Sequence, residues 1–282
     1  MSIFFADDSN LFKNSQDIST LERDLNNILD AISFWLKVNK LSLNIKKTHY
    51  MIFSKKRSVK TPTVNLKIDG ELLSEVNKTK FLGIIIDNKL TWRDHINYIS
   101  GKISRGIGIL IKARAILNRD TLITIYYSFI YPYYIYCNHI WGCTANTRLN
   151  RLSVLQKKAV RIICHKNRKC HSPPLFKELN FLNLSQINKY LIGQFMYRCY
   201  QNILPSLFDA YFRRSNMIHP YNTRQASHFY EVCVVRTDYC KTSIRFRGPS
   251  IWNEIMKKKL CPDVTICTFK FHLKKLLMND EL

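Results

Sequence analysis

The sequence predicts an α+β fold, with short strands and one long helix in its first third and mostly helices after that. Three observations carry this prediction. Apolar residues alternate or form short runs near 3–12, 41–53 and 64–86, residues 17–39 place them at helical spacing, and the same spacing dominates from Trp92 onward. The chain has 282 residues, of which 46% are hydrophobic, so one large domain or two moderate ones can bury real cores.

Residues 3–12 predict a hairpin with two acids at its tip. Ile3 and Phe5 would share one face of a strand, and Asp7 and Asp8 fall where polar turn residues belong. Two adjacent carboxylates repel each other unless a cation lies between them, so one interpretation is a divalent-metal site with hard oxygen ligands. The other interpretation is a solvated turn, because Asp is a common turn former.

The next segments predict a helix and a series of strands. Residues 17–39 form an amphipathic helix in this interpretation, and residues 41–53 form one strand or two with a break. Val64–Ile68, a turn at Asp69-Gly70 and a strand from Phe81 to Ile86 complete the series.

Residues 92–117 predict another helix, and residues 121–147 contain no charged side chain. A length of that kind raises the question of a transmembrane helix. We reject this interpretation because tyrosines are spread along the whole segment and Pro132 lies in its middle. A buried helix pair, kinked at Pro132 and with its tyrosine hydroxyls bonded within the protein, is expected instead.

The formal net charge of +24 is the strongest signal of composition. Residues 1–146 carry 20 basic and 12 acidic side chains, a net charge of +8, and residues 147–282 carry 24 and 8, a net charge of +16. Clustered Lys and Arg are favoured by phosphates through counterion release, so nucleic acid is the expected partner. A basic but inert surface is the alternative.

The most strongly basic segment runs from Arg148 to Lys169 and contains no acidic residue. Its apolar residues predict a helix that packs on one face, while Arg151, Lys158 and Arg161 line the other face at helical spacing, as a helix that follows a nucleic-acid backbone requires. A solvated charged face is the alternative.

A third region begins at the break Ser172-Pro173-Pro174 and contains an aromatic-rich helix near 191–200. Basic and aromatic residues alternate over 243–249, which suits contacts with phosphates and bases, or equally a strand with one packed face. An amphipathic helix over 269–277 closes the chain.

The nine cysteines all follow residue 136, and their odd number and low density fit a reducing compartment, so an intracellular location in cytoplasm and nucleus is expected. No targeting segment is expected before them, because Asp7 interrupts the apolar residues that follow Met1. The pairs Cys164-His165 and Cys170-His171 lack the spacing of a zinc knuckle, so zinc is not expected.

Taken in order, these segments resemble the reverse transcriptase of a non-LTR (LINE-type) retrotransposon, from its FADD motif to the carboxyl terminus. Five stretches carry the resemblance. Phe5-Ala6-Asp7-Asp8 resembles the polymerase motif on a palm hairpin, Phe81 to Ile96 is similar to the block where palm passes into thumb, Tyr126 to Gly142 resembles the thumb signature, and Phe246 to Asn253 resembles the carboxyl-terminal region. Leu43 to Thr48 resembles the motif that follows the hairpin and its helix.

The resemblance implies roles for particular residues. Asp7 and Asp8 would be catalytic ligands of Mg²⁺ or Mn²⁺, and Lys47 would donate a proton to, or stabilise, the departing pyrophosphate, with Lys46 as its competitor. RNA template, DNA primer and deoxynucleoside triphosphates would be the partners, with no membrane involved. The residues expected to contact nucleic acid are Arg148, Arg151, Lys157, Lys158, Arg161, Lys166, Arg245 and Arg247.

The resemblance also implies a division into a partial palm (1–91), a helical thumb (92–171) and a carboxyl-terminal region (172–282). Reverse transcriptases of this kind have one more catalytic aspartate and the fingers before the hairpin. The chain lacks both, so we expect it to be inactive as a polymerase by itself.

Two alternatives to a polymerase remain. A non-catalytic nucleic-acid-binding remnant of such a protein would keep the basic helices and have a decayed palm. A phosphoacceptor receiver domain needs a third Asp at the end of a later strand and a Lys beyond it. Asp87 ends an apolar strand but comes too late for that role, and a chain of this charge is a poor match to that class.

Overall fold

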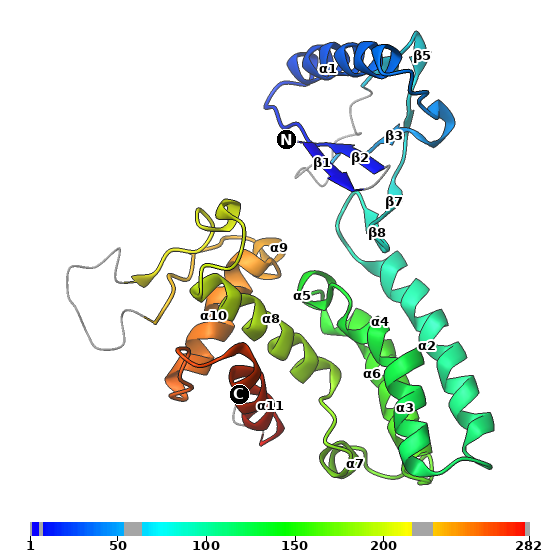
Figure 1. Cartoon of the computed structure of the whole chain (residues 1–282), viewed down its shortest axis with the longest axis vertical. Coiled ribbons are helices and arrows are strands. Elements are labelled where there is room, and N and C mark those ends of the chain that lie inside the picture. Colours follow the sequence, from blue (N-terminus) through cyan, green and yellow to red (C-terminus); the bar gives the residue numbers. More distant parts are fainter. Residues whose placement is uncertain (1, 6–7, 54–63, 216–227, 280–282) are drawn as a thin grey trace. The chain divides into compact units, whose positions relative to one another are not determined.

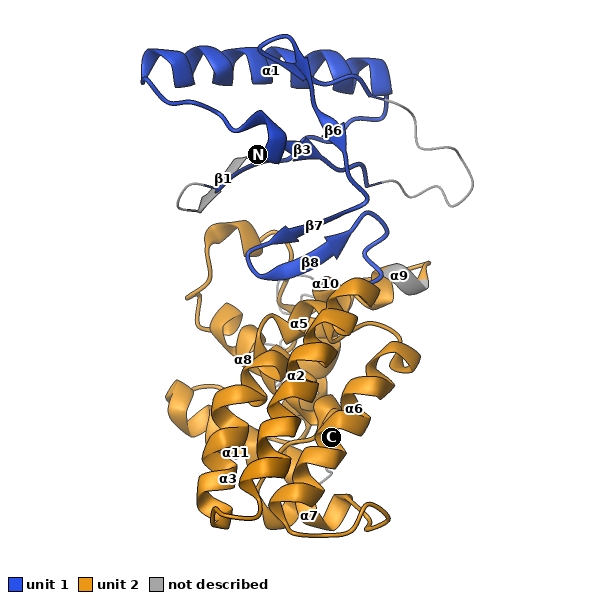
Figure 2. Cartoon of the chain, turned by 90° about the vertical axis from the view of Figure 1, so that its right-hand side faces the viewer, with its two compact units in different colours: residues 1–91 blue, residues 92–282 orange. Residues whose placement is uncertain are grey.

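The computed structural model describes all residues except 1, 6–7, 54–63, 216–227 and 280–282, and the side chains of 2–5 and 238–239 also lie outside the description. The chain forms two compact units, Met1–Thr91 and Trp92–Leu282, which Figure 2 shows in different colours. The first unit mixes strands and helix and the second is helical, so the predicted α+β class is confirmed.

In its described residues, the first unit contains four small two-stranded sheets and one long helix. The pairs are β1 with β2, β4 with β5 and β7 with β8, all antiparallel, and β3 with β6, which is parallel. Its elements are β1 (Ser2–Phe5), β2 (Asp8–Leu11), α1 (Ile18–Val38), the 3-10 turn η1 (Ile45–Lys47), β3 (His49–Tyr50), β4 (Lys67–Ile68), β5 (Glu71–Leu72), β6 (Ser74–Glu75), β7 (Lys78–Phe81) and β8 (Ile84–Asp87).

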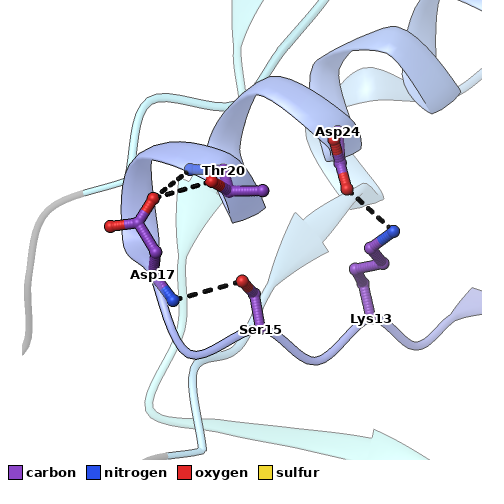
Figure 3. A network of polar contacts seen from close by, with 5 residues as sticks. All are labelled: Lys13, Ser15, Asp17, Thr20 and Asp24. Carbon is purple, nitrogen blue, oxygen red and sulfur yellow. Dashed lines mark hydrogen bonds and ion pairs between the residues drawn. The ribbon is translucent and has the colours of Figure 1, made fainter.

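Helix α1 begins where the sequence predicts, because Asp17 caps it. The Asp17 carboxylate accepts hydrogen bonds of 2.8 Å from both the amide and the hydroxyl of Thr20, satisfying an amide that the helix leaves without a partner (Figure 3). Lys13 forms an ion pair of 2.9 Å with Asp24 one turn further on (Figure 3). The cap at Asp17 and the ion pair at Asp24 therefore both stabilise the start of the helix.

A small core fixes α1 against β4. Leu29 of α1 is buried together with Val64, Leu66, Ile68 and Leu73. Only one stripe of the helix is covered in this way, since Phe34 and Trp35 are 70% and 57% exposed.

Two tight turns organise the remaining strands. Asp69 and Gly70 have φ angles of 52° and 80° and join β4 to β5, so the predicted turn is confirmed. The prediction of one strand from Phe81 to Ile86 is wrong. Leu82 and Gly83 have φ angles of 44° and 82°, and this left-handed pair reverses the chain into the β7–β8 hairpin. An apolar residue at the first turn position hid the turn within an apolar run.

The second unit is built from helices. Figure 1 shows α8, α10 and α11 side by side, and α2 packs along α3 and α6. Its elements are α2 (Arg93–Ala113), α3 (Arg119–Phe129), α4 (Tyr131–Ile135), α5 (Asn138–Trp141), α6 (Asn146–Ile163), α7 (Pro173–Glu178), α8 (Leu184–Tyr200), the 3-10 turn η2 (Ser206–Phe208), α9 (Asp238–Lys241), α10 (Ile244–Lys257) and α11 (Ile266–Met278).

The uncharged tyrosine-rich segment lies inside this unit. The predicted break is confirmed, since α3 ends at Phe129 and α4 starts with Pro132 in its first turn, and the short helix α5 follows in addition. The hydroxyl of Tyr134 donates to the carbonyl of Leu152 at 2.9 Å, and that of Tyr126 accepts from Gln156 at 3.2 Å. No helix within the described residues is long and apolar enough to cross a membrane.

One buried apolar cluster includes side chains from α2 through α11, among them Ile103, Trp141, Trp252 and Leu273. Glycines permit its closest approaches, because a Cβ on Gly106 would lie 2.6 Å from Ile130. The cluster contains side chains from both sides of the predicted boundary, such as Ile163 and Leu175, and the division into thumb and carboxyl-terminal region between residues 171 and 172 stays a prediction.

Residues 244–257 form helix α10, so the interpretation of 243–249 as a strand is wrong. Pro249 lies inside this helix, where its missing amide costs one hydrogen bond. Gly248 compensates by close packing, since a Cβ there would lie 2.7 Å from the sulfur of Met196 on α8. The alternation of basic and aromatic residues therefore comes from a helix end that packs against α8.

Candidate nucleic-acid interface and acidic hairpin

The hairpin β1–β2 contains Asp8, one residue of the acidic pair. Phe5 pairs with Asp8 across the antiparallel ladder, so Asp8 lies at the end of the hairpin where β2 begins. Asp8 is the first residue of β2 and is exposed. Asp7 lies outside the described residues, so the structure locates one carboxylate of the two, at the end of the hairpin that the sequence predicts.

Lys47 is the last residue of the turn η1, and Asn44 caps the start of this turn. The Asn44 side chain accepts a hydrogen bond of 3.3 Å from the Lys47 amide. Both Lys46 and Lys47 are exposed. The turn therefore presents two ammonium groups, and exposure does not distinguish Lys47 from Lys46 for the predicted role at the pyrophosphate.

Helix α6 separates its apolar and basic residues as predicted. Leu152, Ala159 and Ile163 are fully buried, while Arg151 and Lys158 on the other side are exposed and Arg161 is half-buried. The exposed cations of the predicted interface in or just after this helix are Arg148, Arg151, Lys157, Lys158 and Lys166.

Three arginines of this segment have partners within the protein. Arg151 donates to the Asn97 side chain of α2 at 3.3 Å, and Arg148 donates to Thr144 at 3.1 Å. Arg161 is half-buried, and its Nε–H group donates to the carbonyl of Cys170 at 2.7 Å. That bond fixes the loop after α6, so Arg161 has a structural task besides the role predicted for it.

The other flank of α6 faces a cavity of about 550 Å³. We call this cavity the α6–α10 pocket. It is lined from α6 by Asn146, Asn150, Ser153 and Lys157, from α8 by Asn188, and from α10 by Arg247. The structure thus brings together two predicted nucleic-acid-binding residues, Lys157 and Arg247, that are far apart in the sequence. The spacing of the four α6 residues is the signal that places them on one side of the helix.

Arg247 is held at the pocket by buried amides. Its Nη2 group donates to Asn188 Oδ1 at 3.4 Å, and Asn188 Nδ2 donates to Asn138 Oδ1 at 2.9 Å. Asn188 and Asn138 are 4% and 0% exposed. Burial raises the pKa of the neighbouring Cys143 thiol, and the positive charge of Arg247 lowers that pKa in part.

Arg245 lies on the same helix turn and is exposed. Its guanidinium carbon is 5.6 Å from the centre of the Tyr211 ring, a cation–π distance. In the described part of the chain, no group of three or more His, Cys, Asp or Glu side chains is arranged to hold a metal ion.

Comparison with known proteins gives the class of protein to which the chain is similar, namely RNA-directed DNA polymerases of mobile elements. It is 32% identical over 162 residues to the polymerase of the mobile element jockey from Drosophila funebris and 29% identical over 165 residues to that of transposon BS from Drosophila melanogaster. Both alignments cover 56% of this chain. The polymerase of the Drosophila melanogaster X-element is 23% identical over 190 residues, or 66% of the chain.

These relatives confirm the resemblance to reverse transcriptases of non-LTR elements. The alignments span only 17% to 21% of the length of the relatives. No family model matches the chain, and no solved structure matches it.

Proposed function

We propose that this chain is a segment of an RNA-directed DNA polymerase of a non-LTR retrotransposon, and that it holds the template and primer through helix α6. The observation that carries the proposal is the separation of α6 into a buried apolar stripe and an exposed basic face, in a chain of net charge +24 whose relatives are named as such polymerases. Contacts of this kind are made to phosphates, so they tolerate any sequence and weaken with salt.

The β1–β2 hairpin is assigned the catalytic carboxylates. Asp8 is exposed, and a carboxylate is the donor type that Mg²⁺ and Mn²⁺ prefer, so the residue fits such a metal. Divalent ions bound there would supply charge stabilisation to the nucleotidyl transfer from a deoxynucleoside triphosphate. Asp7 and Asp8 supply a charge of −2, which calls for further ligands beyond this pair before two such ions are neutralised.

Lys47 is assigned a charge-stabilising or proton-donating role toward the leaving pyrophosphate. The support is its exposed ammonium group on a short turn whose cap is made by Asn44. Lys46 is its natural control, because it lies in the same turn and carries the same charge.

The second candidate function is nucleic-acid binding without catalysis. The extensive helical core of the second unit favours it, because the basic helices form one packed body by themselves. In that case the hairpin would have no catalytic task in this chain.

Primer extension on an RNA template separates the two candidates. DNA synthesis that requires Mg²⁺ or Mn²⁺ and is lost in Asp7→Asn and Asp8→Asn, with template–primer binding unchanged, would establish the polymerase. Binding of the primed RNA without any synthesis would favour the second candidate. Absence of both binding and synthesis would contradict both.

A further inference from the structure

The α6–α10 pocket has the chemistry of a site for a phosphate group. Lys157 and Arg247 line it, and none of its lining residues, all of which are described, is acidic. Within the described residues Lys157 forms no ion pair. Two cations that line one concave site without an acidic residue in its lining concentrate a positive potential there.

The neutral residues of the pocket also indicate which kind of phosphate ligand it suits. Asn146, Asn150 and Ser153 of α6 and Ser185 and Asn188 of α8 carry amides and hydroxyls, the groups that accompany Lys and Arg in contacts with phosphates and sugars. No aromatic residue lines the pocket, so it offers no surface on which a base could stack. This composition suits the backbone of a nucleic-acid strand rather than its bases.

The guanidinium of Arg247 is also positioned before any ligand arrives. Asn188 contacts it, and Asn188 is itself bonded to Asn138, which is fully buried. The Asn138 amide nitrogen has no hydrogen-bond partner among the described residues, so this layer is retained at a cost in stability. A group that is held in place loses less conformational entropy when it binds.

We propose that the α6–α10 pocket binds a backbone phosphate of a nucleic-acid strand between Lys157 and Arg247. The proposal rests on the proposed function and adds one site to it. Residues 172–282 then contribute directly to nucleic-acid binding through Arg247, and α6 uses two flanks, with Lys157 at the pocket and Arg151 on the flank toward α2.

The test measures binding of a fluorescein-labelled DNA primer annealed to an RNA template by the full chain, using anisotropy. The double variant Lys157→Gln/Arg247→Gln is expected to weaken binding about tenfold near physiological salt, because a charge-assisted contact to one phosphate is lost. Each single variant is expected to lose nearly as much as the double variant, since both side chains hold the same group. Additive losses would contradict a shared phosphate.

A matched control removes the same charge elsewhere. Lys112 on α2 and Lys258 after α10 are exposed and do not line the pocket, so Lys112→Gln/Lys258→Gln should weaken binding less than about twofold. A pocket variant no weaker than this control would overturn the proposal. If Arg151→Gln/Lys158→Gln weakens binding in that case, the proposed function stands and only the pocket assignment fails, whereas a wild-type chain that does not bind primed RNA at low salt contradicts both.

Three further measurements keep the test decisive. Arg247→Lys preserves the charge and should recover part of the affinity, and far-ultraviolet circular dichroism should show every variant folded, so that a lost site is distinguished from a lost fold. A mononucleotide at the same phosphate concentration should not displace the strand. Displacement would assign the pocket to a free nucleotide and contradict the proposal.

Discussion

The hydroxyl of Tyr134 donates a hydrogen bond of 2.9 Å to the main-chain carbonyl of Leu152, and both side chains are fully buried. This bond ties the tyrosine-rich segment to the buried face of α6, opposite the cations. We expect Tyr134→Phe to lower the free energy of unfolding by about 1 kcal/mol, the usual value of one such bond. Denaturant unfolding checks it, with Tyr133→Phe as control, since the structure shows no hydrogen bond from that half-buried hydroxyl to a described residue. Equal effects of the two variants would contradict the assignment.

Two glycines of helix α2, Gly106 and Gly108, lie in different surroundings and can be compared. A Cβ at Gly106 would lie 2.6 Å from Ile130 Cγ1 and 3.2 Å from the Phe129 carbonyl, so Gly106→Ala should destabilise the second unit by about 1–3 kcal/mol. Gly108 has nothing within 4 Å of the added carbon, so Gly108→Ala should stabilise it by up to about 1 kcal/mol through helix propensity. Thermal unfolding measures both signs, and a stabilising Gly106→Ala would refute the close α2–α3 packing.

His95 predicts a pH dependence of stability. Burial against Trp141 lowers its pKa from the ordinary 6.5 to about 4. Its neutral form is favoured in the folded state, so its contribution is fully present above pH 6.5 and is lost as pH falls toward 4, by up to about 3 kcal/mol.

His95→Gln should flatten this dependence between those two pH values, as measured by denaturant unfolding. A residual slope of the same sign is expected, because burial also lowers the pKa of His139. Exposed His272 supplies the control, since His272→Gln should leave the curve of the wild-type chain unchanged. A slope that persists in full in His95→Gln would show that this histidine is not the cause.

Asp69 connects the turn after β4 to helix α1. Lys37 donates to its carboxylate at 2.6 Å, and Ser33 also donates to it. Both bonds lower the pKa of Asp69, and the bond from Lys37 has the larger effect. The stabilisation is present above the pKa that Asp69 has in the unfolded chain, and it is lost as pH falls through the lower pKa of the folded chain. Asp69→Asn tolerates the left-handed turn but loses the ion pair, so amide exchange in α1 should quicken at neutral pH and respond less to acid. Unchanged exchange would show that the ion pair does not hold α1.

Periodicity and turn chemistry predicted most helices and the Asp69-Gly70 turn, because these features depend on neighbouring residues. The Leu82-Gly83 turn was missed since leucine rarely adopts a positive φ angle. Helix α10 was not predicted because Pro249 is unfavourable inside a helix, and its compensation, the contact of Gly248 with Met196, comes from α8.

In the candidate site, too, local features could be predicted and features that depend on packing between helices could not. The exposed face of α6 follows from helical spacing alone. That Lys157 and Arg247 line the same pocket could not be predicted, because it depends on how α10 packs on α8 and how the buried pair Asn188–Asn138 holds the arginine.

The salt dependence of template–primer binding tests the central claim most directly. The logarithm of the binding constant for a DNA-primed RNA should fall linearly with the logarithm of salt concentration, and Arg151→Gln/Lys158→Gln should reduce that slope by about 1 per phosphate contact removed. The control Lys112→Gln/Lys258→Gln should keep the wild-type slope. Binding that does not respond to salt, or no binding of primed RNA even at low salt, would contradict a basic helix that holds nucleic acid.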